Sequence, residues 1–426
     1  MDWQVYCAGI IFIIVYAIII SEKVHRTITA LLGATIMIII GIISQEEAIN
    51  TIDFNTIGLL VGMMLLVGII RKSGVFEYVA IVSAQKTKGD PIKILMVLAF
   101  ITALASSLLD NVTTVLLIVP VTCAIAKRLD ICPFPYLMIE IFASNIGGTA
   151  TLIGDPPNIM IGGRTNLGFM DFIVNLAPII IVILIVTVLL FALIYRKKLV
   201  VTEERKQSVM NLNGRKAIKD PVLLKKSMMV LALVLFGFFT HQYLKLEPAS
   251  IALMGASLLM LITREHGPEV ALLGVEWPTI FFFIGLFTLV GSLEKVGIIE
   301  MLAHQIINLT QGNLTITAIS ILWLSAIASA FIDNIPFTAA MIPLIKSIGQ
   351  MTAGLPLEPL WWSLSLGACL GGNGTLVGAS ANIVVVGLSA RHGVEISFIR
   401  FLKYGFPIMI LSIIISTIYI YLRYLL

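Results

Sequence analysis

Charged residues are scarce in this sequence. Asp, Glu, Lys and Arg make up only 12% of its 426 residues, against about 25% in a typical soluble domain. Hydrophobic residues make up 58%, and uninterrupted apolar runs such as 176–194 and 406–422 are long enough to cross a hydrocarbon core of ~30 Å. Because these runs are continuous and do not alternate, the pattern predicts an all-α polytopic membrane protein, with the cell (plasma) membrane as its expected location.

Cysteine is also rare, and motifs that would indicate an enzyme are lacking. The four cysteines have no metal-ligand spacing. No Gly-x-x-x-x-Gly-Lys-Ser/Thr motif for nucleotide binding is present. We therefore expect no enzymatic activity, no metal centre and no cofactor other than bound Na⁺. The net charge of +4 does not indicate nucleic-acid binding, because the basic residues cluster between the apolar runs.

The sequence contains an internal repeat. At an offset of 223 residues, Asp110-Asn111 pairs with Asp333-Asn334, and Pro120 pairs with Pro343. This pattern predicts two repeats, 1–195 and 227–426, joined by a linker at 196–226. Residues 195–226 carry ten Lys or Arg against three acidic residues, which is typical of a cytoplasmic segment. An odd number of membrane crossings in each repeat would give the two repeats inverted topology.

Each repeat is expected to contain one re-entrant hairpin and one interrupted helix. The hairpins are predicted at 92–127 and 315–348, where an Asp-Asn pair divides a long apolar stretch into two arms. Complete helices joined by a polar loop outside the membrane are the alternative. The interrupted helices are predicted at 134–162 and 358–390. The basic loop 22–26 is expected on the cytoplasmic side. The remaining spans are predicted at 7–21, 27–44, 55–71, 172–195, 227–242, 248–263, 279–293 and 404–425.

The interrupted helices carry polar residues that could bind an ion. Glycines, threonines and Pro156-Pro157 break an apolar helix and expose backbone carbonyl and N–H groups. Neutral side-chain oxygens suited to a hard cation such as Na⁺ come from Asn145, Thr149, Thr151, Asn158, Asn373, Thr375, Ser380 and Asn382. Glycine pairs, which let the backbone approach a ligand closely, stand at Gly147-Gly148 and Gly371-Gly372. Helix packing through small residues is the alternative explanation.

Four carboxylates fall in the predicted hairpins and interrupted helices. Asp110 and Asp333 lie in apolar surroundings, where an unpaired carboxylate could exchange a proton for a cation, or could simply cap a helix. Asp155 has no acidic counterpart in the second repeat, which has Ala379 there; it is either a third site carboxylate or part of a surface turn. Glu140 is a weaker candidate, either a proton relay or a residue near the cytoplasmic interface.

The sequence resembles a known superfamily at four motifs. They are Leu109-Asp110-Asn111-Val112-Thr113-Thr114, Asn145-Ile146-Gly147-Gly148 with Gly154-Asp155-Pro156-Pro157-Asn158, Asp333-Asn334-Ile335-Pro336-Phe337-Thr338, and the run from Gly371 through Asn373 and Thr375 to Asn382. They resemble the ion transporter superfamily of arsenite permeases and NhaD-type sodium/proton antiporters, on the branch of the melanosomal P protein and its prokaryotic relatives. The resemblance implies an inverted-repeat, two-hairpin fold similar to that of sodium-coupled dicarboxylate transporters. It also implies elevator-type movement, a homodimer, and ion or substrate binding by the motif residues, Thr113 included.

Three functions remain open at this point. The first is a secondary active transporter of a small inorganic ion, by sodium/proton antiport or by arsenite/antimonite-type efflux, coupled through Asp110 and Asp333. Its energy would come from an ion gradient or from a separate ATPase subunit. The second is a sodium-coupled dicarboxylate or citrate-type anion transporter, against which the sequence offers no well-placed Arg or Lys within the membrane. The third is a passive anion (chloride) channel.

Overall fold

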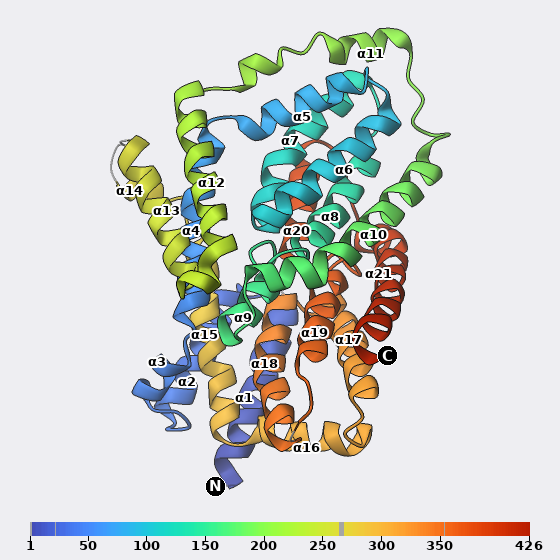
Figure 1. The fold of residues 1–426 in the computed structure, drawn as a ribbon. Helices are drawn as coiled ribbons and strands as arrows, with labels where there is room; N and C mark the ends of the chain where they lie inside the picture. Colours follow the sequence, from blue (N-terminus) through green and yellow to red (C-terminus); the bar gives the residue numbers. More distant parts are fainter. Residues whose placement is uncertain (1, 22, 264–267, 353) are drawn as a thin grey trace.

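The computed structural model describes residues 2–21, 23–263, 268–352 and 354–426, and their regular secondary structure is helical (Figure 1). The first half contains α1 (Asp2–Ser21), α2 (Arg26–Ile39), α3 (Gln45–Thr51), α4 (Phe54–Lys72), α5 (Val75–Lys86), α6 (Pro91–Leu108), α7 (Asn111–Leu129), α8 (Phe134–Gly148), α9 (Pro156–Arg164) and α10 (Phe169–Tyr195). The connecting segment contains α11 (Glu203–Met210). The second half contains α12 (Pro221–Leu244), α13 (Pro248–Thr263), α14 (Pro268–Leu272), α15 (Trp277–Lys295), α16 (Ile298–Thr310), α17 (Leu314–Phe331), α18 (Asn334–Met351), α19 (Glu358–Gly371), α20 (Ser380–Arg391) and α21 (Phe398–Ile420).

The surface and the lengths of these helices are those of a multi-pass membrane protein. Among the described residues, nine helices are long and apolar enough to cross a membrane. Large apolar side chains face outwards from them, as at Ile13 and Leu193, whose exposed fractions are 68% and 64%. In water such exposure would be costly, whereas lipid solvates it. The prediction of an all-helical, multi-span membrane protein is therefore confirmed.

Corresponding helices of the two halves make corresponding contacts. Helix α6 packs against α8 as α17 packs against α19, and α2 packs against α15 as α13 packs against α4. The last two crossings depend on the repeat-matched glycines Gly62 and Gly285. A Cβ atom at Gly62 would lie 2.7 Å from the carbonyl carbon of Ala252, and one at Gly285 would lie 2.7 Å from that of Ala30. Only glycine allows the two backbones to approach so closely.

Helix α2 is shorter than the span predicted at 27–44. It ends at Ile39, because Gly41 adopts a left-handed conformation and the N–H of Ile42 turns back to the carbonyl of Met37. A helix of 14 residues is about 21 Å long, which is too short to cross a hydrocarbon core. Arg26, at the first turn of α2, is partly buried beside the α17–α18 turn.

The Asp-Asn motifs lie at the turn between α6 and α7 and at the turn between α17 and α18. Asp110 caps α7 and Asp333 caps α18. Helix α9 packs against α18, and α20 packs against α7, so the second part of each interrupted helix contacts the other half of the molecule. The paired helices α6, α7, α17 and α18 are 18 or 19 residues long, which is enough for a crossing. Their re-entrant arrangement, like the division into inverted repeats, therefore stays a prediction.

The basic linker lies against the first half and does not hang free. Arg205 pairs with Asp130 at 2.8 Å, and Ser208 donates a hydrogen bond to the carbonyl of Arg128. Further along, the N–H of Lys219 donates to the carbonyl of Ser73 at 3.0 Å. Figure 1 shows α11 crossing one end of the molecule above α5 and α7. The linker thus joins the α4–α5 turn to the end of α7.

Candidate functional site

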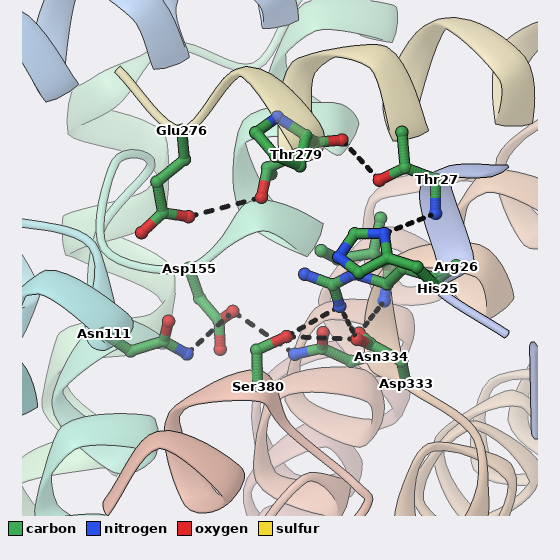
Figure 2. A network of polar contacts seen from close by, with 12 residues as sticks. His25, Arg26, Thr27, Asn111, Asp155, Glu276, Thr279, Asp333, Asn334 and Ser380 are labelled. Carbon is green, nitrogen blue, oxygen red and sulfur yellow. Dashed lines mark hydrogen bonds and ion pairs between the residues drawn. The ribbon is translucent and has the colours of Figure 1, made fainter. Parts of the chain in front are cut away.

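Asp155 lies at the centre of the molecule, where the two Asp-Asn motifs converge. It stands immediately before α9, and Pro156 begins that helix. The side chain of Asp155 is fully buried, so the surface-turn interpretation is wrong. Its Oδ1 accepts hydrogen bonds from Asn111 at 3.4 Å and from Asn334 at 3.2 Å (Figure 2). A single carboxylate oxygen therefore holds the first residue of α7 and the first residue of α18.

The second oxygen of Asp155 is unusual. Within the described part of the chain, Oδ2 is buried and accepts no hydrogen bond of normal geometry, although the thiol of Cys369 lies beside the carboxylate. Buried polar atoms in proteins are almost always paired, because an unpaired one loses its hydration without compensation. A carboxylate with one free buried oxygen is thus a place for a proton or a cation.

Three asparagines tie the two interrupted helices together beside Asp155. Asn145 donates from Nδ2 to Asn373 Oδ1 at 2.9 Å and to Asn382 Oδ1 at 3.0 Å. Its own Oδ1 accepts a bond from Asn111 at 3.3 Å. All four side chains are buried. The break after α8 and the break after α19 therefore belong to one polar network that also includes the α6–α7 turn.

Several other predicted site residues use their side-chain donor groups to bind backbone carbonyls near the helix breaks. Asn158 Nδ2 donates to the carbonyls of Thr149 and Thr151, and Asn382 Nδ2 donates in the same way to Gly372 and Thr375. The hydroxyl groups of Thr149, Thr151 and Thr375 donate to the carbonyls of Asn145, Ser107 and Ala330 respectively. These bonds reach carbonyls at the two helix breaks and, for Ser107 and Ala330, at the C-terminal ends of α6 and α17.

The glycine pairs pack helices closely. A Cβ atom at Gly147 would collide with the carbonyl of Ala103, and one at Gly371 would lie 2.6 Å from that of Ala326. Gly148 and Gly372 each face the other end of their own break, at Gly154 and Gly378. Helix packing, the alternative weighed for these residues, accounts for all four positions.

The two Asp-Asn turns are not equivalent. Asp110 accepts bonds from the N–H groups of Val112 at 2.8 Å and Thr113 at 3.1 Å, and from the hydroxyl of Thr113. Asp333 caps α18 through the N–H of Ile335, but its Oδ2 forms an ion pair with Arg26. The expectation of an unpaired carboxylate at Asp333 is therefore wrong, and Arg26 is a basic side chain beside the site that the sequence argument against an anion substrate does not include.

Sequence reasoning missed three residues of this site. A small cavity of about 30 Å³ is lined by Asp110, Asn111, Asp155, Asn334 and Ser380, and also by Arg26, Glu276 and Thr279. Thr279 donates to Glu276 at 3.2 Å. The repeat itself contained the signal for this pair, because Thr279 and Glu276 are offset by 223 from Thr56 and Asp53, which are bonded in the same way at 2.7 Å. The sequence pattern predicts Arg26 in the basic loop 22–26. Residue 22 of that loop lies outside the described residues.

A larger cavity adjoins the central one. It has a volume of about 420 Å³, shares Met64 and Glu276 with the small cavity, and is lined further out by Arg71, Lys219 and Glu77. Another cavity, of about 190 Å³, is lined by residues of both halves; it includes Phe287, the repeat counterpart of Met64, and Arg164, which pairs with Asp53 at 3.7 Å. The central cavity thus shares its lining with a larger cavity that extends towards the linker segment at Lys219.

Glu140 lies apart from these cavities. Its side chain is fully buried, and Thr122 donates to Oε1 at 2.5 Å. Oε2 has no hydrogen-bond partner among the residues described. Its predicted role as a proton relay stays a prediction, and no described cavity reaches it.

Comparison with known proteins agrees with the sequence motifs. The profile of the citrate transporter family (CitMHS) matches residues 16–367. A 46 kDa membrane protein of Mycobacterium leprae is 42% identical over 423 residues, covering 97% of this chain and 98% of its own. The P protein of Homo sapiens is 32% identical over 502 residues, covering 99% of this chain but only 60% of its own length.

The fold also has a known counterpart. The crystal structure of the Alcanivorax borkumensis YdaH transporter superposes with a TM-score of 0.60, covering 88% of this chain and 86% of that one, at 14% sequence identity. This likeness concerns the fold alone. The profile match, the relatives and the multi-span helices place the protein among membrane transporters and not among enzymes. The chain belongs to the CitMHS family of secondary transporters, within the ion transporter superfamily.

Proposed function

We propose that this protein exchanges a small cation for protons, as a sodium/proton antiporter, with Asp155 as the coupling carboxylate. The observation that carries the proposal is the free, buried Oδ2 of Asp155, on a side chain whose other oxygen holds both Asp-Asn turns. A proton and a Na⁺ ion cannot occupy this oxygen together. Binding of one would displace the other, and that competition couples their movements in opposite directions.

Charge supports a cation as the transported species. The described lining of the central cavity includes three acidic side chains, Asp110, Asp155 and Glu276, but one basic side chain, Arg26. Arg26 is already paired with a fourth carboxylate, Asp333. Buried negative charges that have no cationic side chain beside them must be neutralised by protons or by bound cations.

Size supports a small ion. The central cavity of about 30 Å³ matches the volume of roughly one water molecule in the liquid. It has room for a small ion such as Na⁺ or for a water molecule. The neutral oxygens of Asn111 and Thr279 nearby are the ligands that hard cations prefer. The cavity of about 420 Å³ that shares Glu276 would be the route by which the ion reaches this position.

Alternating access would follow from the repeats. In this proposal the two halves have inverted topology, and α6–α10 with α17–α21 form a body that moves against α1–α4 and α12–α15. The contacts favour this division, because α6 packs on α8 and α17 on α19, whereas α2 and α4 pack on α15 and α13. An elevator-type movement of a dimer is the corresponding expectation for a protein of this architecture.

One observation favours a second candidate, sodium-coupled uptake of an organic anion. Arg26 is a guanidinium at the edge of the central cavity, and the family profile is described as that of a citrate transporter. An anion could bind in the larger cavity, with Arg71 or Lys219 meeting its carboxylates. Against this, the basic side chain nearest the centre is engaged by Asp333.

Reconstitution in liposomes with a trapped pH indicator tests the proposal. Addition of Na⁺ outside is expected to raise the lumenal pH, because Na⁺ enters as protons leave. Addition of K⁺, arsenite or citrate at the same concentration is expected to cause little change. Acceleration of the signal by citrate would favour the anion transporter, and a flux that follows the membrane potential without any proton movement would favour a channel.

A further inference from the structure

Asp110 and Asp333, which occupy matching positions in the repeated sequence, differ in the groups that bind their carboxylates. In the described part of the chain, the recorded hydrogen bonds to Asp110 all come from its own helix, from Val112 and Thr113. Thr113 supplies both a backbone N–H and a hydroxyl group. Its counterpart at the offset of 223 is Pro336, which has neither. Asp333 therefore lacks the two donors that Thr113 gives Asp110, and from its own helix it keeps the N–H of Ile335.

An arginine from a distant helix takes their place. Arg26, at the start of α2, forms an ion pair with Asp333 Oδ2 through Nη1, and the same nitrogen lies 2.8 Å from Ser380 Oγ (Figure 2). Ser380 donates to Asp333 at 3.1 Å. The guanidinium also lies over the ring of Phe282, 5.1 Å from its centre. The side chains of Arg26 and Asp333 are 26% and 12% exposed, so water screens the pair only in part.

We propose that Arg26 is a tethered cation that occupies the second of two carboxylate sites, so that only the Asp110–Asp155 side takes up transported Na⁺. This inference rests on the proposed function and specifies how many ions bind. A guanidinium does not lose its proton at any physiological pH, so a change of pH cannot vacate the site. Because it is covalently attached, its effective concentration at Asp333 is high, and free Na⁺ competes poorly.

The number of Na⁺ ions bound per chain tests this proposal. Equilibrium binding of radioactive Na⁺ to the purified full-length protein is the measurement. Arg26→Gln leaves Asp333 without a cation, and we expect it to bind one more Na⁺ per chain than the unaltered protein. Arg26→Lys retains a cation at the same place and is expected to keep the original number. The double variant Arg26→Gln/Asp333→Asn removes the site itself and is expected to return to that number, whatever its transport rate.

Two single aspartate variants give a second reading if Arg26→Gln does not fold. Asp155→Asn is expected to lose one bound Na⁺ per chain, whereas Asp333→Asn is expected to lose none. A lost Na⁺ in Asp333→Asn, or an unchanged number in folded Arg26→Gln, would overturn the role of Arg26 as a tethered cation. In that case Arg26 would only brace α2 against α17–α18. Absence of Na⁺ binding by the unaltered protein would instead contradict the proposed function itself.

Discussion

Replacing Asp155 by asparagine is expected to lower Na⁺-driven proton flux in liposomes by about 100-fold or more, while the protein still folds. Asparagine has nearly the same shape and retains an oxygen that can accept from Asn111 and Asn334. It has no charge, however, and cannot take up a proton. In the proposed mechanism, Asp155 and Na⁺ form a buried charge pair. Loss of one partner of such a pair costs about 3–5 kcal/mol, which corresponds to a factor of at least about 100 in binding.

The matched control is Asp130→Asn. Asp130 ends α7 at the surface and pairs with Arg205 of the linker, with its side chain 70% exposed. The same chemical change there is expected to leave the flux within about twofold, because exposed ion pairs contribute little. Flux in Asp155→Asn at more than half the level of Asp130→Asn would remove Asp155 from the mechanism.

Replacing Asn145 by leucine is expected to have the largest effect on stability. The change breaks the bonds to Asn373, Asn382 and Asn111, and leaves their polar atoms buried without partners. Each unpaired buried group costs about 1–3 kcal/mol, so the sum is a large part of the 5–15 kcal/mol that typically stabilises a folded protein. We expect a fall of at least about 5 °C in the temperature at which the detergent-solubilised protein loses monodispersity.

Asn211→Leu provides the comparison for that measurement. Asn211 follows α11 in the linker and its side chain is exposed. The same substitution there is expected to change the transition temperature by less than about 2 °C, since surface changes usually fall within ±0.5 kcal/mol. If the two variants unfold at the same temperature, the asparagine network does not hold the two interrupted helices together.

Much of the fold could be predicted because the same motifs occur twice in the sequence. Continuous apolar runs predict spanning helices regardless of tertiary context, and a break in such a run must be compensated inside the protein. The Asp-Asn pairs and the polar runs after α8 and α19 therefore identified residues that the structure brings together around Asp155. The burial of Asp155 itself could not be predicted, because Asp-Pro-Pro is equally typical of an exposed turn.

Arg26 was missed for a physical reason. An arginine between two apolar runs usually marks a membrane interface, and the run after it is long enough to suggest a complete span. The structure differs because Gly41 ends α2 early and Arg26 reaches the α17–α18 turn. The roles of Gly147 and Gly371 were also beyond the sequence, since a glycine that approaches a carbonyl and one that approaches a ligand follow the same pattern.

Proton release on Na⁺ binding tests the central claim most directly. Na⁺ is added to the purified protein in weakly buffered detergent solution, and the released protons are measured with an indicator. If a proton and Na⁺ compete for the free oxygen of Asp155, NaCl releases protons from the unaltered protein and none from Asp155→Asn, whereas choline chloride releases none from either. Equal release from both proteins, or Na⁺ binding without any proton release, would contradict the account.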